Sequence, residues 1–263
     1  MSSPRSLSGL RVLVTGASSG IGAAVSTLVA ARGARVVGTG RSPSALKLAP
    51  AGALEAAVVR DLTEPGAPAE VVQAAVSALG GLDVVVSNAG AGWSGRFETM
   101  SPADIDTVLD INLRAPMHLT NAAAPYLLNS EAGGQLVLIG SIVGLVGVAE
   151  EVAYGAAKYG LRGLADGLRS EWARDAAGRR ATVTLVSPGV VDTPFFTRRN
   201  QPYERAWPKP MPVSRVARLV VSSIEHRRED VVVPAWLLLA GRLNGGVPAL
   251  YRLLAQIPDR TRR

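Results

Sequence analysis

The sequence predicts an α/β protein with a doubly wound parallel sheet of about seven strands and helices on both faces. Through the first 190 residues, apolar β-branched runs alternate with longer segments of helical period, which is the pattern of repeated βαβ units. A glycine-rich turn directly follows the first of these runs. The length of 263 residues suits one large domain, and no repeat or linker marks a second, so we expect a single domain over residues 1–263.

Each expected strand is a short apolar run that ends at turn residues. The strands cover residues 11–14, 35–39, 57–59, 83–87, 135–139, 182–186 and, at the sheet edge, 231–233. Helical period predicts helices over residues 21–32, 102–128 and 153–174. Ser101 is a good N-cap, and Pro102 fits the first helical position after it. From about residue 193 we expect a substrate loop, the last strand and a basic, apolar C-terminal segment.

Composition excludes several kinds of site. Cysteine is absent, and the only histidines are His118 and His226, which stand far apart. A disulfide framework, a thiolate zinc site and a cysteine nucleophile are therefore excluded, and we expect no metal. His118 has no spaced partner on its helix, so we interpret it as a packed or interface histidine.

Charge is unevenly distributed along the chain. Residues 198–263 hold 13 Lys or Arg against 5 Asp or Glu, whereas residues 1–197 hold 15 against 16. Nucleic-acid binding is disfavoured because the basic part lacks a recognition module. The first ten residues carry no secretory apolar run, and the longest apolar run, 231–240, is too short to span a bilayer. We therefore expect a cytoplasmic protein.

A glycine loop between the first strand and the first helix predicts a phosphate site. In the segment 15–22, Gly16, Gly20 and Gly22 stand where the backbone must turn tightly and approach a ligand. Free amides at the helix N-terminus attract a pyrophosphate. The spacing differs from the standard dinucleotide fingerprint, and a merely structural turn is the alternative.

The end of the second strand favours NADP(H) over NAD(H). An acidic residue there would bind the ribose 2′-hydroxyl, but the sequence offers none. Arg41 is placed to bind a 2′-phosphate through charge-assisted hydrogen bonds, with Ser42 as a second donor. The alternative is a solvated loop arginine.

Tyr154 and Lys158 predict an acid/base pair. They stand four residues apart in a helical segment and therefore share a helix face. A neighbouring ammonium favours the phenolate and should lower the pKa of the tyrosine. Ser141 follows the fifth strand, at the sheet edge where open α/β sheets place their sites. An exposed Tyr–Lys pair is the alternative.

Taken together, these motifs resemble the short-chain dehydrogenase/reductase family and its single Rossmann-fold domain. They are residues 15–22, Asn88-Ala89-Gly90, Asn112, Ser141, Tyr154 with Lys158, and Pro188-Gly189. The resemblance spans about residues 7–194, and we expect it to cover the whole chain. Ser87 departs from the family pattern, in which an Asn precedes the Asn-Ala-Gly motif.

The resemblance implies a role for each of these residues. Ser141 would polarise the substrate carbonyl, Tyr154 would donate the proton, and Lys158 would hold the nicotinamide ribose while lowering the tyrosine pKa. Asn112 would position a relay water. The implied cofactor-binding residues are Gly16, Ser18, Ser19, Gly20, Ile21, Gly22, Arg41, Ser42, Asp61, Leu62, Asn88, Ala89, Gly90, Tyr154, Lys158, Pro188, Gly189, Val191 and Thr193, with Val190 also near the nicotinamide amide. The implied substrate-binding residues are Ser141, Val143, Trp93, Tyr154 and Phe195, and for Trp93 and Phe195 the alternative is that they cover the core.

We therefore expect an NADP(H)-dependent oxidoreductase that interconverts a secondary alcohol and a ketone. The substrate is expected to be hydrophobic: a 3-oxoacyl, steroid-like or other lipophilic ketone. A homodimer or homotetramer is the family habit. The alternative function is a non-catalytic NADP(H)-binding sensor or scaffold. For the C-terminal segment, three interpretations stay open: a lid or subunit contact, a helix lying on an anionic membrane, or a basic patch for an acidic carrier or coenzyme A.

Overall fold

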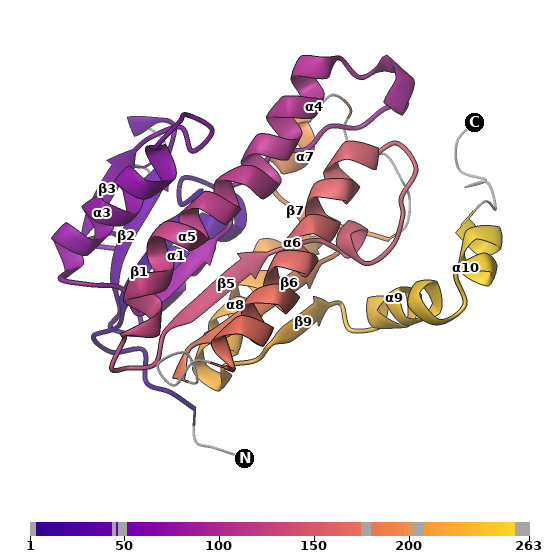
Figure 1. Cartoon of the computed structure of the whole chain (residues 1–263). Helices are drawn as coiled ribbons and strands as arrows, with labels where there is room; N and C mark the ends of the chain where they lie inside the picture. Colours follow the sequence, from indigo (N-terminus) through magenta and orange to yellow (C-terminus); the bar gives the residue numbers. More distant parts are fainter. Residues whose placement is uncertain are drawn as a thin grey trace.

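The computed structural model describes residues 4–43, 46, 52–174, 180–199, 201, 203 and 208–255, without the side chains of residues 252, 254 and 255. Its centre is a seven-stranded sheet in the order β3-β2-β1-β4-β5-β6-β9, and every pair of neighbouring strands is parallel (Figure 1). The strands are β1 (Arg11–Thr15), β2 (Arg35–Gly40), β3 (Ala56–Val59), β4 (Val84–Ser87), β5 (Gln135–Ile139), β6 (Thr182–Pro188) and β9 (Asp230–Val233). The predicted fold class is thereby confirmed.

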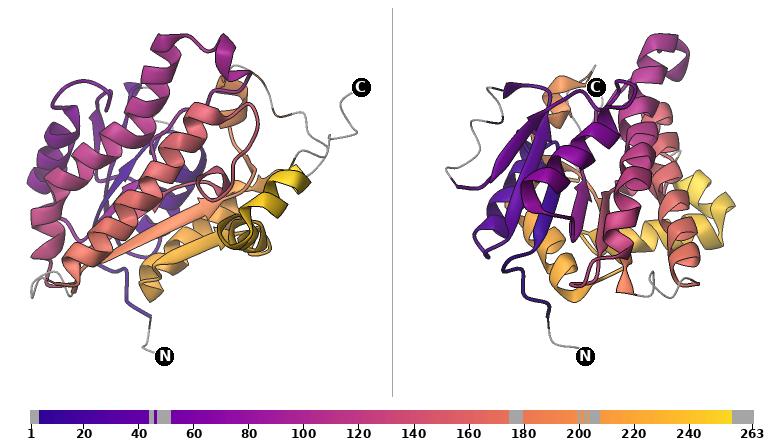
Figure 2. Two further views of the ribbon diagram at one scale, coloured as in Figure 1. Left: turned by 45° about the vertical axis from the view of Figure 1, so that its right-hand side comes forward. Right: turned by 60° about the vertical axis from the view of Figure 1, so that its left-hand side comes forward.

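Helices cover both faces of the sheet (Figure 2). On one face, α1 packs against α8, and on the other α3 packs against α5, with α6 alongside. The helices are α1 (Gly20–Ala30), α3 (Ala67–Leu79), α4 (Pro102–Leu109), α5 (Ala115–Leu128), α6 (Val152–Trp172), α7 (Phe195–Arg198), α8 (Val213–His226), α9 (Leu237–Gly246) and α10 (Pro248–Ala255). None of the helices among the described residues is both long and apolar enough to span a membrane.

The sheet has a hydrophobic core on each face, and β5 shows why its strands are continuously apolar. All five of its residues are buried. Leu136 and Leu138 join the core beneath α3, α5 and α6, whereas Val137 and Ile139 join the core beneath α1 and α8. Each fully buried valine or leucine contributes roughly 1.5–3 kcal/mol. Because both faces are covered, an alternating polar pattern would leave polar groups buried.

Strand order reverses beside β1, and this reversal positions the site. The chain moves outward from β1 to β2 and β3, and then returns to the other side of β1 with β4. Ligands of open α/β sheets bind at such a switch point, outside the carboxyl ends of the strands. The loops after β1 and β4 therefore lie side by side at this edge of the sheet.

The helix expected over residues 102–128 is interrupted. A π-helical turn, Asp110–Arg114, separates α4 from α5. Pro116 accounts for it, because proline has no amide hydrogen and its ring needs the space of the carbonyl four residues earlier. That carbonyl belongs to Asn112, which therefore sits in the widened turn.

Several elements were not among those expected. They are α3, α7, α8, the α9–α10 pair and the two-residue strands β7 (Val191–Asp192) and β8 (Met211–Pro212). The expected edge strand over 231–233 is present as β9, and the expected strand over 83–87 begins one residue later than predicted.

Candidate active site

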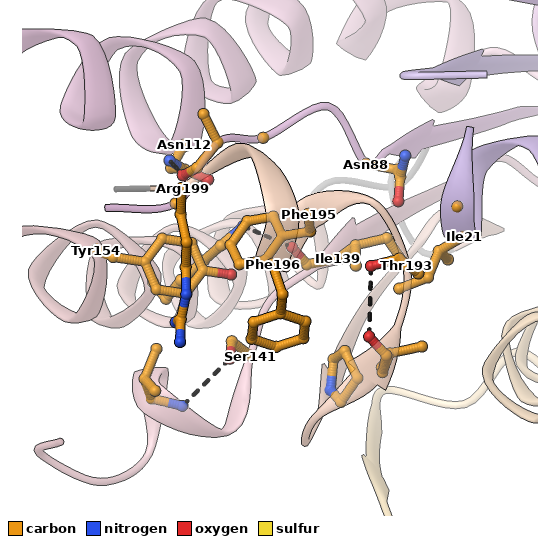
Figure 3. Close-up of a pocket in the computed structure, with 18 of the residues that line it drawn as sticks. Ile21, Asn88, Asn112, Ile139, Ser141, Tyr154, Thr193, Phe195, Phe196 and Arg199 are labelled. Atoms are coloured by element: carbon orange, nitrogen blue, oxygen red, sulfur yellow. Dashed lines mark hydrogen bonds between the residues drawn. The ribbon is translucent and has the colours of Figure 1, made fainter. Parts of the chain in front are cut away.

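A cavity of about 790 Å³ opens at the carboxyl ends of the strands. Figure 3 shows Ile21, Asn88 and Thr193 at one end, and Tyr154, Phe195, Phe196 and Arg199 at the other. Of the predicted site residues, those that line it are Gly16, Ser18, Ser19, Gly20, Ile21, Arg41, Asp61, Leu62, Asn88, Ala89, Gly90, Asn112, Ser141, Val143, Tyr154, Lys158, Pro188, Gly189, Val191, Thr193 and Phe195. Gly22, Ser42 and Trp93 lie outside its wall, although all three are among the described residues.

The glycine loop after β1 is shaped by close approach. Gly16 and Gly20 have φ values of +67° and +57°, which favour glycine. A Cβ on Gly22 would lie 2.3 Å from the Gly16 carbonyl oxygen and 2.5 Å from Asn88 Nδ2. Gly22 therefore lets the first turn of α1 pack directly against Gly16 and Asn88. Ser19, the N-cap of α1, makes no capping hydrogen bond within the described structure, so the first amides of the helix face the cavity without a side-chain acceptor.

Asn88 fastens the turn after β4 to the glycine loop. Its amide Nδ2 donates to the Thr15 carbonyl oxygen at 2.9 Å, and its backbone N–H donates to Thr15 Oγ1, also at 2.9 Å. The N–H of Ala89 donates to the same hydroxyl at 3.0 Å. The two loops at the switch point are therefore one hydrogen-bonded unit.

The loop after β2 presents a cation to the cavity rim. The Arg41 side chain is 75% exposed, and its Nη1 lies 3.9 Å from Asp61 Oδ2. Asp61 is held in place, since its Oδ1 accepts from the backbone N–H and the hydroxyl of Thr63 at 3.0 and 2.8 Å. A long, loosely paired guanidinium at this rim can turn toward an anion.

At the other end, β5 and α6 bring the predicted catalytic side chains together. Ser141 follows β5, its Oγ accepts from the Val143 N–H at 3.4 Å, and its hydroxyl lies close enough to the Tyr154 phenol to lower the pKa of that phenol. One turn along α6, Lys158 is buried and its Nζ donates to the Ile139 carbonyl oxygen at 3.0 Å. That Nζ lies 5.5 Å from the centre of the Tyr154 ring.

Asn112, in the π-helical turn, lines the same cavity as Ser141, Tyr154 and Lys158. Its Nδ2 donates to the Ala91 and Val108 carbonyl oxygens at 2.7 and 2.9 Å. Its Oδ1 is buried and has no hydrogen-bond partner among the described residues. A buried acceptor without a partner is costly, so this oxygen fits an ordered water or ligand donor.

The pKa of Tyr154 differs from the expectation. Burial raises the pKa of the phenol and the nearby Glu151 carboxylate raises it further, while the Ser141 hydrogen bond and Arg199 lower it. The expected lowering by Lys158 does not appear. Burial instead lowers the pKa of Lys158 to about 8, because the ammonium is also removed from water.

The short helix α7 closes over Tyr154. The Phe195 ring lies 5.4 Å from the Tyr154 ring and sits directly over Gly92, where a Cβ would come within 2.5 Å of it. Arg199 Nη1 pairs with Glu151 Oε1 at 2.7 Å, and the two side chains are only 6% and 17% exposed. The guanidinium also lies over the Phe196 ring at 4.7 Å.

The Glu151–Arg199 pair was missed by sequence reasoning. The two residues stand 48 positions apart with no motif between them, and only the nearness of Glu151 to Tyr154 in the sequence could have drawn attention to it. Both residues line the cavity.

Two sequence interpretations need correction. The Trp93 indole packs with Met100, Val108 and Ala153 and lies over Gly95, where the missing Cβ leaves room for it, so it covers a small core rather than lining the cavity. His118 is exposed on α5, so it is not packed within the chain, and its interpretation as an interface residue stays a prediction.

Comparison with known proteins places the chain among relatives. A family model described as short chain dehydrogenase matches residues 11–204. The chain is 34% identical over 194 residues to the 3-oxoacyl-(acyl-carrier-protein) reductase FabG of Thermotoga maritima, which covers 72% of this chain and 77% of that protein.

Solved structures agree with this placement. A short chain dehydrogenase from Burkholderia cenocepacia, in complex with NADP, superposes with a TM-score of 0.76 at 31% identity, covering 87% of this chain and 98% of that one. A short chain dehydrogenase/reductase from Burkholderia phymatum, in complex with NAD, gives a TM-score of 0.84 over 93% and 96% of the two chains, and at 22% identity it shows the fold alone.

Proposed function

Because this chain belongs to the short-chain dehydrogenase/reductase family, an oxidoreductase family that acts on alcohol and keto groups, we propose that it is NADP(H)-dependent and reduces a hydrophobic ketone. The observation that carries the proposal is one continuous cavity with the glycine loop at one end and Ser141, Tyr154 and Lys158 at the other. A nicotinamide cofactor supplies the hydride when it is bound. The protein supplies orientation and the proton.

The residues around the glycine loop fit such a cofactor. Gly16 and Gly22 leave no room for a Cβ, and the first amides of α1 face the cavity, which suits a pyrophosphate. We propose that Asp61 and Leu62 border the adenine, that the turn at 88–90 forms the floor, and that Thr193 faces the nicotinamide. Lys158 would hold the nicotinamide ribose.

The protonation state of Tyr154 favours reduction. Burial and the Glu151 carboxylate raise the pKa of the phenol, so it carries its proton at neutral pH and is ready to donate it to a developing alkoxide. Ser141, which lines the cavity together with Tyr154, would bind the same carbonyl oxygen and polarise it. The Oδ1 of Asn112, which has no partner among the described residues, would hold a water that supplies a new proton to Tyr154.

The preference for NADP(H) rests on Arg41. No carboxylate stands at the end of β2, and the exposed Arg41 guanidinium is only loosely paired with Asp61 at 3.9 Å. A 2′-phosphate would offer it charge-assisted hydrogen bonds. The NADP bound to the relative from Burkholderia cenocepacia supports this assignment.

A hydrophobic substrate is supported by the wall beyond Tyr154. The apolar side chains that line this end are Val143, Val146, Val148, Phe195, Phe196, Trp236, Leu237 and Ala240. The name of the Thermotoga maritima relative suggests a 3-oxoacyl chain, and a steroid-like or other lipophilic ketone would meet the same surface.

Steady-state turnover tests this function. The purified protein should oxidise NADPH in the presence of lipophilic ketones, with a lower KM for NADPH than for NADH. Tight NADPH binding without turnover of any ketone in the panel would instead favour a nucleotide-binding sensor.

We also propose how the enzyme is organised in the cell. It would be a single domain over residues 1–263, cytoplasmic, and a homodimer or homotetramer that brings together the helices carrying Asn112 and Tyr154. Exposed Met117 and His118 on α5 fit such a contact. Light scattering on the protein as it elutes from a size-exclusion column measures its mass and so tests the oligomeric state.

A further inference from the structure

The two C-terminal helices carry several exposed apolar side chains. Figure 1 shows α9 and α10 extending past β9, at the edge of the molecule. The exposed apolar side chains, here called the C-terminal apolar surface, are Trp236, Leu238, Leu239, Val247, Leu250 and Leu253. Leu239 and Leu253 are 66% and 65% exposed, the largest values among the described large hydrophobic residues. Apolar side chains gathered in this way mark an interaction site.

The opposite side of these helices is fixed to the catalytic domain. Asn244 Nδ2 donates to the Leu145 carbonyl oxygen at 3.0 Å, and the Tyr251 hydroxyl donates to the Gly147 carbonyl oxygen at 3.1 Å. Leu237 is buried against Gly189. The helices therefore have one face held by the loop that follows Ser141 and one face directed outward.

The same helices form part of the wall of the catalytic cavity. Trp236, Leu237, Ala240 and Tyr251 all line it, beside the end that holds Ser141 and Tyr154. Trp236 belongs both to the C-terminal apolar surface and to this wall, so the surface adjoins the place where a hydrophobic ketone would lie.

Cations surround the surface. Lys209, Arg215 and Arg242 are exposed, and none of the three forms an ion pair with another described residue. Lys209 and Arg215 flank Trp236 in a second cavity of about 270 Å³. In the sequence, residues 233–263 contain five arginines and one aspartate. Exposed leucines with adjacent unpaired cations are the chemistry that binds an anionic lipid surface.

We propose that the C-terminal apolar surface docks on an anionic phospholipid bilayer and that the ketone enters the catalytic cavity from that bilayer, past α9 and α10. The second part rests on the proposed function. A second copy of the chain fits less well, because a symmetric contact would place like charges opposite each other. An acidic carrier protein would pair with the cations but would leave Leu239 and Leu253 without an apolar partner.

Vesicle co-sedimentation tests the docking. Wild-type protein should sediment with phosphatidylcholine–phosphatidylserine vesicles and much less with pure phosphatidylcholine vesicles. The double variant Leu239→Glu/Leu253→Glu should bind at least about tenfold more weakly, since each leucine loses its apolar insertion and gains a repelled charge. Val59→Glu is the matched control: it also adds an acid at an exposed apolar residue, but on β3 at the opposite sheet edge, and should bind as wild type does.

Turnover separates docking from catalysis. The double variant should keep wild-type NADPH binding and wild-type turnover of a water-soluble ketone, which also shows that it is folded, while its turnover of a vesicle-embedded ketone falls. Loss of embedded-ketone turnover in the Val59→Glu control as well would overturn the role of the C-terminal surface. Vesicle binding without turnover of any ketone would overturn the proposed function and leave docking supported.

Three results would overturn the docking. The first is wild-type protein that stays in solution with both kinds of vesicle. The second is a wild-type oligomer that does not bind vesicles and that the double substitution dissociates, which would identify a subunit contact. The third is retention of wild-type protein by an acidic carrier protein but not by vesicles.

Discussion

Lys158→Met is expected to stabilise the fold while abolishing turnover. Methionine keeps the length of the side chain and removes the ammonium, which is buried with the Ile139 carbonyl oxygen as its hydrogen-bond partner. Burial lowers the pKa of Lys158 from 10.5 to about 8. At neutral pH the folded protein therefore holds a charge in a place that disfavours it.

The magnitude follows from that pKa. Keeping this lysine charged in the folded protein lowers the free energy of unfolding by about 3 kcal/mol, which the variant regains. The variant also loses the hydrogen bond to the Ile139 carbonyl oxygen, which offsets about 1 kcal/mol of this gain. We therefore expect Lys158→Met to raise the free energy of unfolding by about 2 kcal/mol at neutral pH, which for a chain of this size raises Tm by roughly 4–8 °C.

The stabilisation should depend on pH in a defined direction. Below pH 8 both the folded and the unfolded wild type carry the proton on Lys158, so the penalty is fully present. Between about pH 8 and pH 10.5 the unfolded state binds more protons than the folded state, and wild-type stability rises relative to the variant. By pH 10.5 the variant should have lost its advantage.

Urea unfolding of wild type and variant at pH 7 and at pH 10.5 measures both effects. The difference between the two proteins isolates Lys158 from the other groups that titrate. A variant less stable than wild type at pH 7, or a stability difference that does not change with pH, would refute the explanation of the lowered pKa by burial.

The remaining predictions concern the cofactor loop, the cofactor rim and α7. Gly22→Ala should cost about 1–3 kcal/mol of stability and weaken NADPH binding, because its Cβ would meet the Gly16 carbonyl oxygen at 2.3 Å. The control Gly167→Ala has open space around it and should stabilise α6 by up to about 1 kcal/mol. Thermal melts that give the two variants the same stability would contradict this. Arg41→Ala should raise KM for NADPH about 10–100-fold and leave KM for NADH nearly unchanged, and equal effects would remove the 2′-phosphate role. Arg199→Met should lower stability by roughly 2–3 kcal/mol, because it leaves Glu151 without its partner. It should also slow ketone reduction, because the phenol of Tyr154 is already protonated at neutral pH and a further rise in its pKa only makes it a weaker proton donor. The double variant with Glu151→Gln should recover stability, and a single variant with wild-type melting and turnover would show that the pair is dispensable.

The fold was predictable because local chemistry and global topology agree in most elements. Apart from Gln135, every residue of the run 135–139 is apolar, and this pattern predicts a strand buried on both faces. Helix α8 was not among the expected elements, although Val216, Val220 and Ile224 recur at helical spacing. The π-helical turn was not predictable, because Pro116 can end, kink or widen a helix, and packing decides among these outcomes.

The site was predictable where its chemistry is local in sequence. The glycine loop and the Tyr154–Lys158 spacing lie within single segments, and the structure brings both to one cavity. The Glu151–Arg199 pair joins two distant segments and left no signal in either. The raised pKa of Tyr154 was equally out of reach, because it depends on how deeply the phenol is enclosed and on which charges surround it.

The most direct test of the assigned chemistry compares wild type with Tyr154→Phe. Both proteins are titrated with NADPH and then mixed with a lipophilic ketone, while the absorbance of the reduced nicotinamide is followed. We predict equal NADPH affinity and a loss of turnover of about 10²–10⁴-fold in the variant, because only the proton donor is removed. Equal turnover by the two proteins would contradict the role of Tyr154 as the acid.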